Sequence, residues 1–223
     1  MMRAFARATA RNLLLTLLPM VSAVSCAPTT PGGSLALTSR TARPLRLDAS
    51  FAHGAYAVED VGASMILSTV SLKDLQSGNF ENAQVVDIQL MWEPRAGRTP
   101  VSSDSTNLII RYVVLVGDQT GIYGGGGFGW PKGTLGKTGF GLDITGSSLS
   151  LVDSTDEFRD LLSPAMLLGR VGGPLDAALT VKMRDTVSQI VTDRLGRPRW
   201  VHQAPTPGPT PGPTPRPSES DRS

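Results

Sequence analysis

Alternation of apolar and polar residues is the clearest pattern in the chain, and it predicts a series of strands. Residues 86–92 (VDIQLMW) place Val86, Ile88, Leu90 and Trp92 at every second position, the period of a half-buried strand. Residues 107–116 (NLIIRYVVLV) are nearly all apolar or β-branched, which is typical of a strand buried on both faces. Shorter patterns predict further strands over residues 63–70, 138–145, 148–152 and 166–171.

Helical spacing appears only late in the chain. Residues 174–195 carry an apolar stripe at intervals of three and four, with Pro174 suited to the first turn and Gly196 to the end. A capping-box pattern, Ser154 with Glu157 three residues later, predicts a short helix over residues 155–162. Strands followed by helices without alternation predict the α+β class, with a mostly antiparallel sheet of about five to seven strands and a long C-terminal helix packed on it.

Composition divides the chain into four parts. Residues 1–25 read as a signal peptide, and residues 26–50, rich in Pro, Thr, Ser and Gly, as a flexible tether. Residues 51–200 are the length of a single globular domain. Residues 201–223 contain a repeated P-T-P-G, which favours polyproline II and predicts a disordered tail.

The leader has the features of an export signal. Arg3, Arg7 and Arg11 form a basic start without any acid, and residues 13–24 are an apolar run of 12 residues. That length fits a signal peptide and is too short for a transmembrane helix, which needs about 20 apolar residues. The arginine spacing also occurs in mitochondrial transit peptides, but the compact leucine block argues against that alternative.

The end of the leader, Ala23-Val24-Ser25-Cys26, resembles the lipobox of bacterial lipoproteins. The resemblance covers only the leader and implies that Cys26 becomes the mature N-terminus and carries a thioether-linked diacylglycerol. It also implies anchoring at the periplasmic or extracellular face of a membrane. Ala23 stands where leucine is usual, and the same residues fit an ordinary cleavage site of a secreted protein. Cys26 is the single cysteine of the chain, which lipid attachment would explain.

The net charge of +2 depends on the leader. Without its three arginines, 18 basic residues face 19 acidic ones. Nucleic acid is therefore not expected as a partner, because the basic balance disappears with the leader.

The segment from Gly124 to Trp130 (GGGGFGW) is the most unusual part of the predicted domain. It matches the G-x-G-x-x-G pattern, but a strand and not a helix is expected to follow, so a nucleotide site is not predicted. Residues 131–138 (PKGTLGKT) fail the P-loop pattern for a similar reason. Phe128 and Trp130 among small residues suggest a shallow aromatic platform for a sugar or a peptide. The alternative is a glycine-eased bend with Trp130 in the core.

Catalytic chemistry has little support in the sequence. G-x-S-x-G is absent, the two histidines are His53 and His202 near the domain ends, and H-E-x-x-H is absent. We therefore predict no catalytic residue, no metal and no cofactor. The leading hypothesis is a lipid-anchored envelope protein with a non-catalytic binding or assembly role. The alternatives are an accessory subunit of an envelope complex and a secreted carbohydrate-active enzyme with paired carboxylates. The carboxylates considered for such a pair are Asp87, Asp143, Asp153, Asp156 and Glu157.

Overall fold

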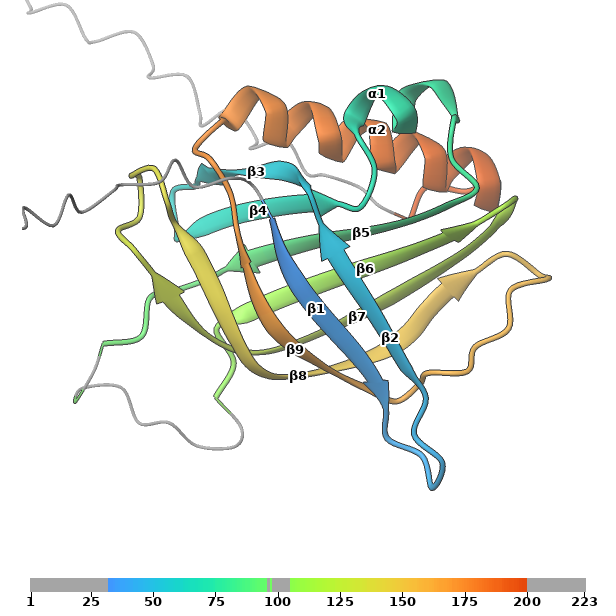
Figure 1. Ribbon diagram of the computed structural model, residues 1–223, viewed down its shortest axis with the longest axis horizontal. Helices are drawn as coiled ribbons and strands as arrows, with labels where there is room; N and C mark the ends of the chain where they lie inside the picture. Colours follow the sequence, from blue (N-terminus) through green and yellow to red (C-terminus); the bar gives the residue numbers. More distant parts are fainter. Residues whose placement is uncertain (1–31, 96, 98–104, 200–223) are drawn as a thin grey trace, which may run out of the picture.

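Nine antiparallel strands make up the domain that the computed structural model describes, which comprises residues 32–95, 97 and 105–199. They form one sheet in the spatial order β2-β1-β9-β8-β7-β6-β5-β4-β3, which coils into a nearly closed barrel (Figure 1). The strands are β1 Gly32–Ser39, β2 Arg46–Phe51, β3 His53–Val58, β4 Ala63–Ser68, β5 Asn82–Leu90, β6 Leu108–Val116, β7 Gln119–Lys132, β8 Gly141–Ser154 and β9 Ala165–Gly172.

The predicted α+β class is wrong. The described chain is mostly antiparallel sheet, with α1 (Leu72–Ser77) and α2 (Ala177–Leu195) as its two helices. The capping-box pattern at Ser154 begins no helix, because the backbone there belongs to the sheet: Ser154 pairs with Gly121, and the Thr155 N–H donates to the Thr120 carbonyl at 3.0 Å.

The predicted tether is also wrong for residues 32–50, which contain β1 and most of β2. Leu35 and Leu37 of β1, and Ala49 and Phe51 of β2, point into the barrel and are buried. These apolar residues occur at every second position, as in a strand, but the high content of Pro, Thr, Ser and Gly around them led to the prediction of a tether.

The glycine-rich segment does not bend the chain away from the sheet. It lies inside β7, which pairs with β8 from Gly121 to Lys132. The strands approach closely here: a Cβ atom added to Gly127 would lie 2.2 Å from the Gly146 carbonyl oxygen. The two strands predicted at 138–145 and 148–152 are one strand, β8, with an irregularity between Ile144 and Ser147.

Large buried side chains fill the barrel interior, among them Tyr56, Tyr112, Tyr123 and Phe140. The tyrosine hydroxyls are satisfied, since Tyr112 donates to Gln84 Oε1 at 2.5 Å and Tyr123 to Asp160 Oδ1 at 3.1 Å. Burial raises the pKa of both phenols, which keeps them as neutral donors. These groups stabilise the core and leave the outer face of the sheet as the surface available for contacts.

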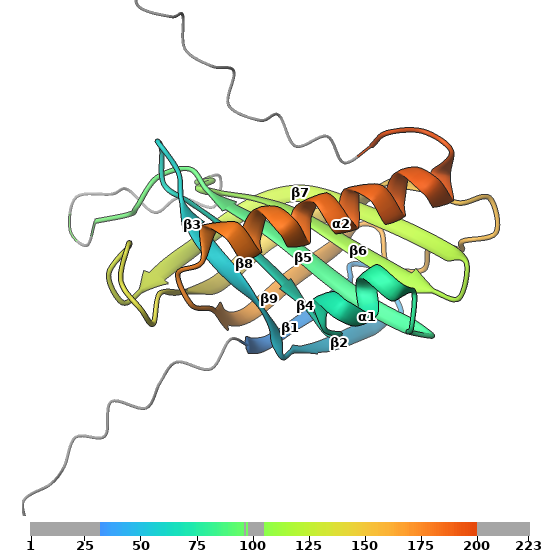
Figure 2. The same cartoon turned by 90° about the horizontal axis from the view of Figure 1, so that it is seen from above.

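Both helices pack on the outer face of the sheet, where α2 crosses β3 and β4 and reaches β7 (Figure 2). Asp176 caps the start of α2 by accepting the Leu179 N–H at 2.9 Å, and Gly196 ends it with φ of 67°. Met183, Val187 and Val191 are buried in this second core. Each such side chain contributes about 1.5–3 kcal/mol by burial.

The segment after β9 helps to close the barrel. The Tyr56 N–H of β3 donates to the Pro174 carbonyl, and the Asp176 N–H donates to the Tyr56 carbonyl, both at 2.9 Å. These bonds cover the edge of β3, which would otherwise present unpaired backbone groups.

The predicted signal peptide, Cys26 and the predicted tail at 201–223 lie outside the described residues.

Candidate ligand-binding surface

An aromatic cluster of Trp92, Phe128 and Trp130 lies on the outer face of the sheet. Phe128 and Trp130 are two residues apart on β7, so they share a face opposite the inward-pointing Tyr123. The Phe128 ring centroid is 5.2 Å from that of Trp130 and 6.2 Å from that of Trp92, both in edge-to-face geometry. Phe128 is 7% exposed and Trp92 37%, so the phenylalanine supports two tryptophans that reach solvent.

A buried asparagine fixes the backbone under this cluster. Asn107 is fully buried; its Nδ2 donates to the Gly129 carbonyl at 2.9 Å, and its Oδ1 accepts the Gly129 N–H at 2.9 Å. The pairing of β6 with β7 ends at Leu108 and Gly127, so the Asn107 amide takes the place of a backbone partner beyond that point. The Trp92 indole N–H donates to the Thr106 carbonyl at 3.2 Å, which orients the second tryptophan.

Charged side chains continue the surface across the neighbouring strands. The sheet register places Trp130 beside Asp143 of β8, Asp143 beside Arg170 of β9, and Arg170 beside Ser34 of β1. Arg170 Nη2 lies 2.9 Å from Asp143 Oδ2, and Lys132 Nζ lies 3.8 Å from the same oxygen. We call Lys132, Asp143 and Arg170 the charged triad.

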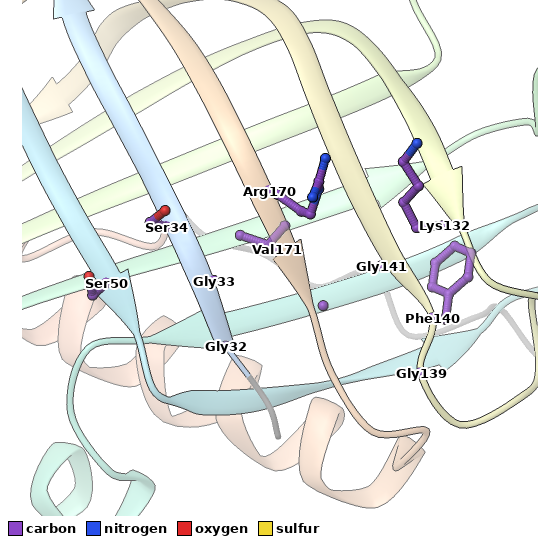
Figure 3. Close-up of a pocket in the computed structure, with 11 residues that line it drawn as sticks. Gly32, Gly33, Ser34, Ser50, Lys132, Gly139, Phe140, Gly141, Arg170 and Val171 are labelled. Carbon is purple, nitrogen blue, oxygen red and sulfur yellow. The ribbon is translucent and has the colours of Figure 1, made fainter. Parts of the chain in front are cut away.

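A groove of about 510 Å³ lies next to the charged triad, over β1, β8 and β9. Its floor includes Gly32, Gly141 and Gly172, which the register places side by side on three strands. Arg170 and Lys132 stand on the same side of the strands with Gly141 between them (Figure 3). The absence of side chains at the glycines leaves room beside the two cations.

This surface combines flat apolar rings with donors and an acceptor of fixed position. Such an arrangement can hold a polar ligand that also has an apolar face, because the rings contact that face while charged groups bind its polar substituents. The cluster, the charged triad and the groove together form the candidate surface.

The structure places the predicted site residues Phe128 and Trp130 together on this surface. Sequence reasoning missed Trp92, because its period-2 position put it with the inward-facing residues of β5. β5 ends at Leu90, and Trp92 lies beyond the strand, where it contacts Phe128 on the outer face. Glu93-Pro94 was the available signal that the strand pattern stops near this point.

Two of the other predicted carboxylates, Asp87 and Asp153, pair with arginines, whereas Asp156 and Glu157 are exposed. Asp87 accepts from the buried Arg184 of α2, with Arg184 Nη2 at 2.6 Å from Asp87 Oδ1. Asp153 binds Arg197 and Arg199, and the hydrogen bond from Arg197 is the main cause that lowers its pKa to about 2. A carboxylate held ionised by arginine is poorly suited to donate a proton as a general acid.

The remaining motifs do not assemble into a site among the described residues. His53 is exposed on β3, and His202 lies outside them. The glycines of the G-x-G-x-x-G pattern lie in β7, with no helix N-terminus after them to receive a phosphate. Within the described part, no group of His, Cys, Asp or Glu side chains is arranged to hold a metal ion.

Neither helix of the described part has the length and apolar character that crossing a membrane requires. Comparisons with models of protein families, with curated proteins and with solved structures find no match to this chain.

Proposed function

We propose that the protein is an exported, lipid-anchored protein of the cell envelope whose barrel binds a glycan without transforming it. The observation that carries the binding role is the continuity of the aromatic cluster with the charged triad on one outer face. The C–H face of a sugar ring packs on an indole, and its hydroxyls form hydrogen bonds with carboxylates and guanidinium groups.

Binding is favoured over glycan hydrolysis by the pairing of the carboxylates. Asp87, Asp143 and Asp153 each contact an arginine, whereas an acid–base pair for glycoside hydrolysis needs one protonated carboxyl group. A surface open on the outer face of a sheet also suits a long polymer that passes over it.

The binding role is tested with Trp130→Ala in native gels that contain embedded polysaccharides. We expect at least one polysaccharide to retard the wild-type chain, and Trp130→Ala to reduce that retardation about tenfold, because the half-buried indole ring is removed from the surface. Leu161→Ala is the matched control, since Leu161 is an apolar side chain that is 63% exposed elsewhere on the surface. Circular dichroism verifies that both variants are folded. Equal retardation of wild type and Trp130→Ala would reject the aromatic cluster as the binding surface.

The anchoring role rests on the leader and is tested with Cys26→Ala. We expect the wild-type chain, expressed in a bacterium, to enter a detergent phase and to carry the mass of attached acyl chains. At about 0.8 kcal/mol per buried CH₂, two or more chains give stable anchoring. Cys26→Ala should remain in the aqueous phase. A wild-type chain that stays aqueous without added mass would remove the lipid anchor from the proposal and leave the binding role untouched.

A further inference from the structure

The charged triad carries more positive than negative charge. Arg170 and Lys132 contact the same Asp143 oxygen, so two cations share one carboxylate. Their side chains are 69% and 54% exposed, whereas that of Asp143 is 29% exposed. The described residues that line the groove include both cations and no acid. The groove therefore favours a ligand that brings a negative charge of its own.

The pairing of β7, β8 and β9 sets the distance between the two cations and the aromatic cluster. Trp130 and Arg170 are separated by one strand, β8, so their backbones are about 10 Å apart. Lys132 follows Trp130 by two residues on the same face of β7, about 7 Å along the strand. A ring that packs on Trp130 thus brings its own substituents, or those of the next ring in a chain, over the charged triad and the groove.

From this geometry we propose that the groove receives the carboxylate of an acidic polysaccharide, one built from uronic acid units. The inference rests on the proposed glycan-binding function and names the class of glycan. The planar guanidinium of Arg170 matches a carboxylate with two parallel donors, and Lys132 adds a second cation beside it. Asp143 holds both cations in place and accepts hydrogen bonds from sugar hydroxyls.

An extended peptide fits this surface less well. Peptides that bind to sheets as added strands use free backbone groups at a sheet edge. The strands under the groove, β1, β8 and β9, are already hydrogen-bonded to neighbours on both sides. A ligand can therefore contact side chains and the space above the glycines, but the backbone N–H and C=O groups of these three strands are already paired with neighbouring strands.

The test compares two polymers with the same sugar backbone, one with free carboxylates and one with methyl esters. Polygalacturonate carries a carboxylate on every unit, and its methyl-esterified form has the same sugar chain with the charge removed. We expect the wild-type chain to bind polygalacturonate about tenfold more tightly at about 50 mM salt, and this preference to shrink at about 500 mM salt because exposed charges are screened. Calorimetry or native-gel retardation gives both affinities.

Arg170→Ala identifies the residue responsible. This variant should lose about tenfold in affinity for polygalacturonate and retain its affinity for the methyl ester. Arg46→Ala is the matched control, because Arg46 also pairs with an aspartate, Asp48, and is 63% exposed on β2. It should bind both polymers as the wild type does.

The outcomes separate this inference from the function on which it rests. Equal binding of the two polymers, or an Arg170→Ala variant that keeps the preference, would overturn the acidic ligand and leave a glycan-binding protein. Tighter binding to a glycerol-phosphate polymer or to a carboxyl-terminal peptide than to polygalacturonate would also overturn it. Failure to bind any glycan in a panel that includes neutral polysaccharides would reject the proposed function itself.

Discussion

At the scale of single residues, Asn107 connects the sheet to the candidate surface. Its amide replaces a strand partner for Gly129, between Phe128 and Trp130 of the aromatic cluster. Because the side chain is fully buried, water does not compensate for its loss. The position of the two tryptophan-bearing segments therefore depends on one buried side chain.

Replacement of Asn107 by alanine should destabilise the domain by about 1–3 kcal/mol, since it leaves a buried N–H and a buried carbonyl without partners. Urea unfolding measures the loss, and tryptophan fluorescence of the folded variant reports changes around Trp92 and Trp130. Asn79→Ala is the control: Asn79 is exposed, and its replacement should change stability by less than about 0.5 kcal/mol. If the two variants were equally stable, Asn107 would not have the role described above.

At the scale of elements, the end of α2 is tied to β8 through Asp153. Arg197 Nη2 lies 2.6 Å from Asp153 Oδ1, and Arg199 Nε lies 2.5 Å from Oδ2. The Asp153 side chain is only 6% exposed, and the hydrogen bond from Arg197, with that from Arg199, lowers its pKa from 3.8 to about 2. The basic residues Arg197 and Arg199 after α2 thus bind the sheet.

The depressed pKa predicts a pH dependence with a definite sign. A carboxyl group with a lowered pKa in the folded state stabilises the protein above its ordinary pKa and loses that effect as the pH falls through the folded value. Asp153→Asn should therefore cost about 1 kcal/mol at neutral pH, because both arginines are more than half exposed. The difference from wild type should disappear between about pH 4 and pH 2.

Urea unfolding across this pH range measures the effect, with the exposed Asp60→Asn as the control. A difference between wild type and Asp153→Asn that stays constant down to pH 2 would contradict the ion pairs between β8 and the segment after α2.

Strong local patterns made some elements predictable from the sequence. β5, β6 and α2 follow the alternating or helical spacing that identifies them, because each buries one face or both against a core. β1 and β2 were missed because only two or three apolar residues in each reach the barrel interior. β8 was divided at Gly146, and the glycine-rich part of β7 was not predicted as a strand, although its glycines allow β7 and β8 to approach closely.

At the scale of the whole molecule, the candidate surface results from the way the strands pair, which brings residues from distant parts of the sequence side by side. Trp92 follows β5, Phe128 and Trp130 belong to β7, Asp143 to β8 and Arg170 to β9. The irregularity in β8 between Ile144 and Ser147 changes which residues face outward along that strand. A single sequence indicates Phe128 and Trp130 as aromatic neighbours, but it does not reveal which residues of other strands lie beside them, because pairing is set by contacts distant in sequence.

Different parts of the barrel surface also have different roles. The inner face and the part of the outer face under α2 are filled by side chains that stabilise the fold. The outer face of β7, β8 and β9 instead carries the aromatic cluster and the charged triad. This division is the reason for placing the ligand on that face.

The most direct measurement of this placement is a glycan titration of the ¹⁵N-labelled Cys26→Ala chain, followed by NMR. Our account predicts that the indole N–H signals of Trp92 and Trp130 and the backbone signals of Lys132, Asp143 and Arg170 shift with ligand concentration. The signals of Val181 and Lys182, on the exposed side of α2, should stay in place. Shifts confined to α2 and the strands beneath it, with the surface on β7, β8 and β9 unchanged, would contradict it.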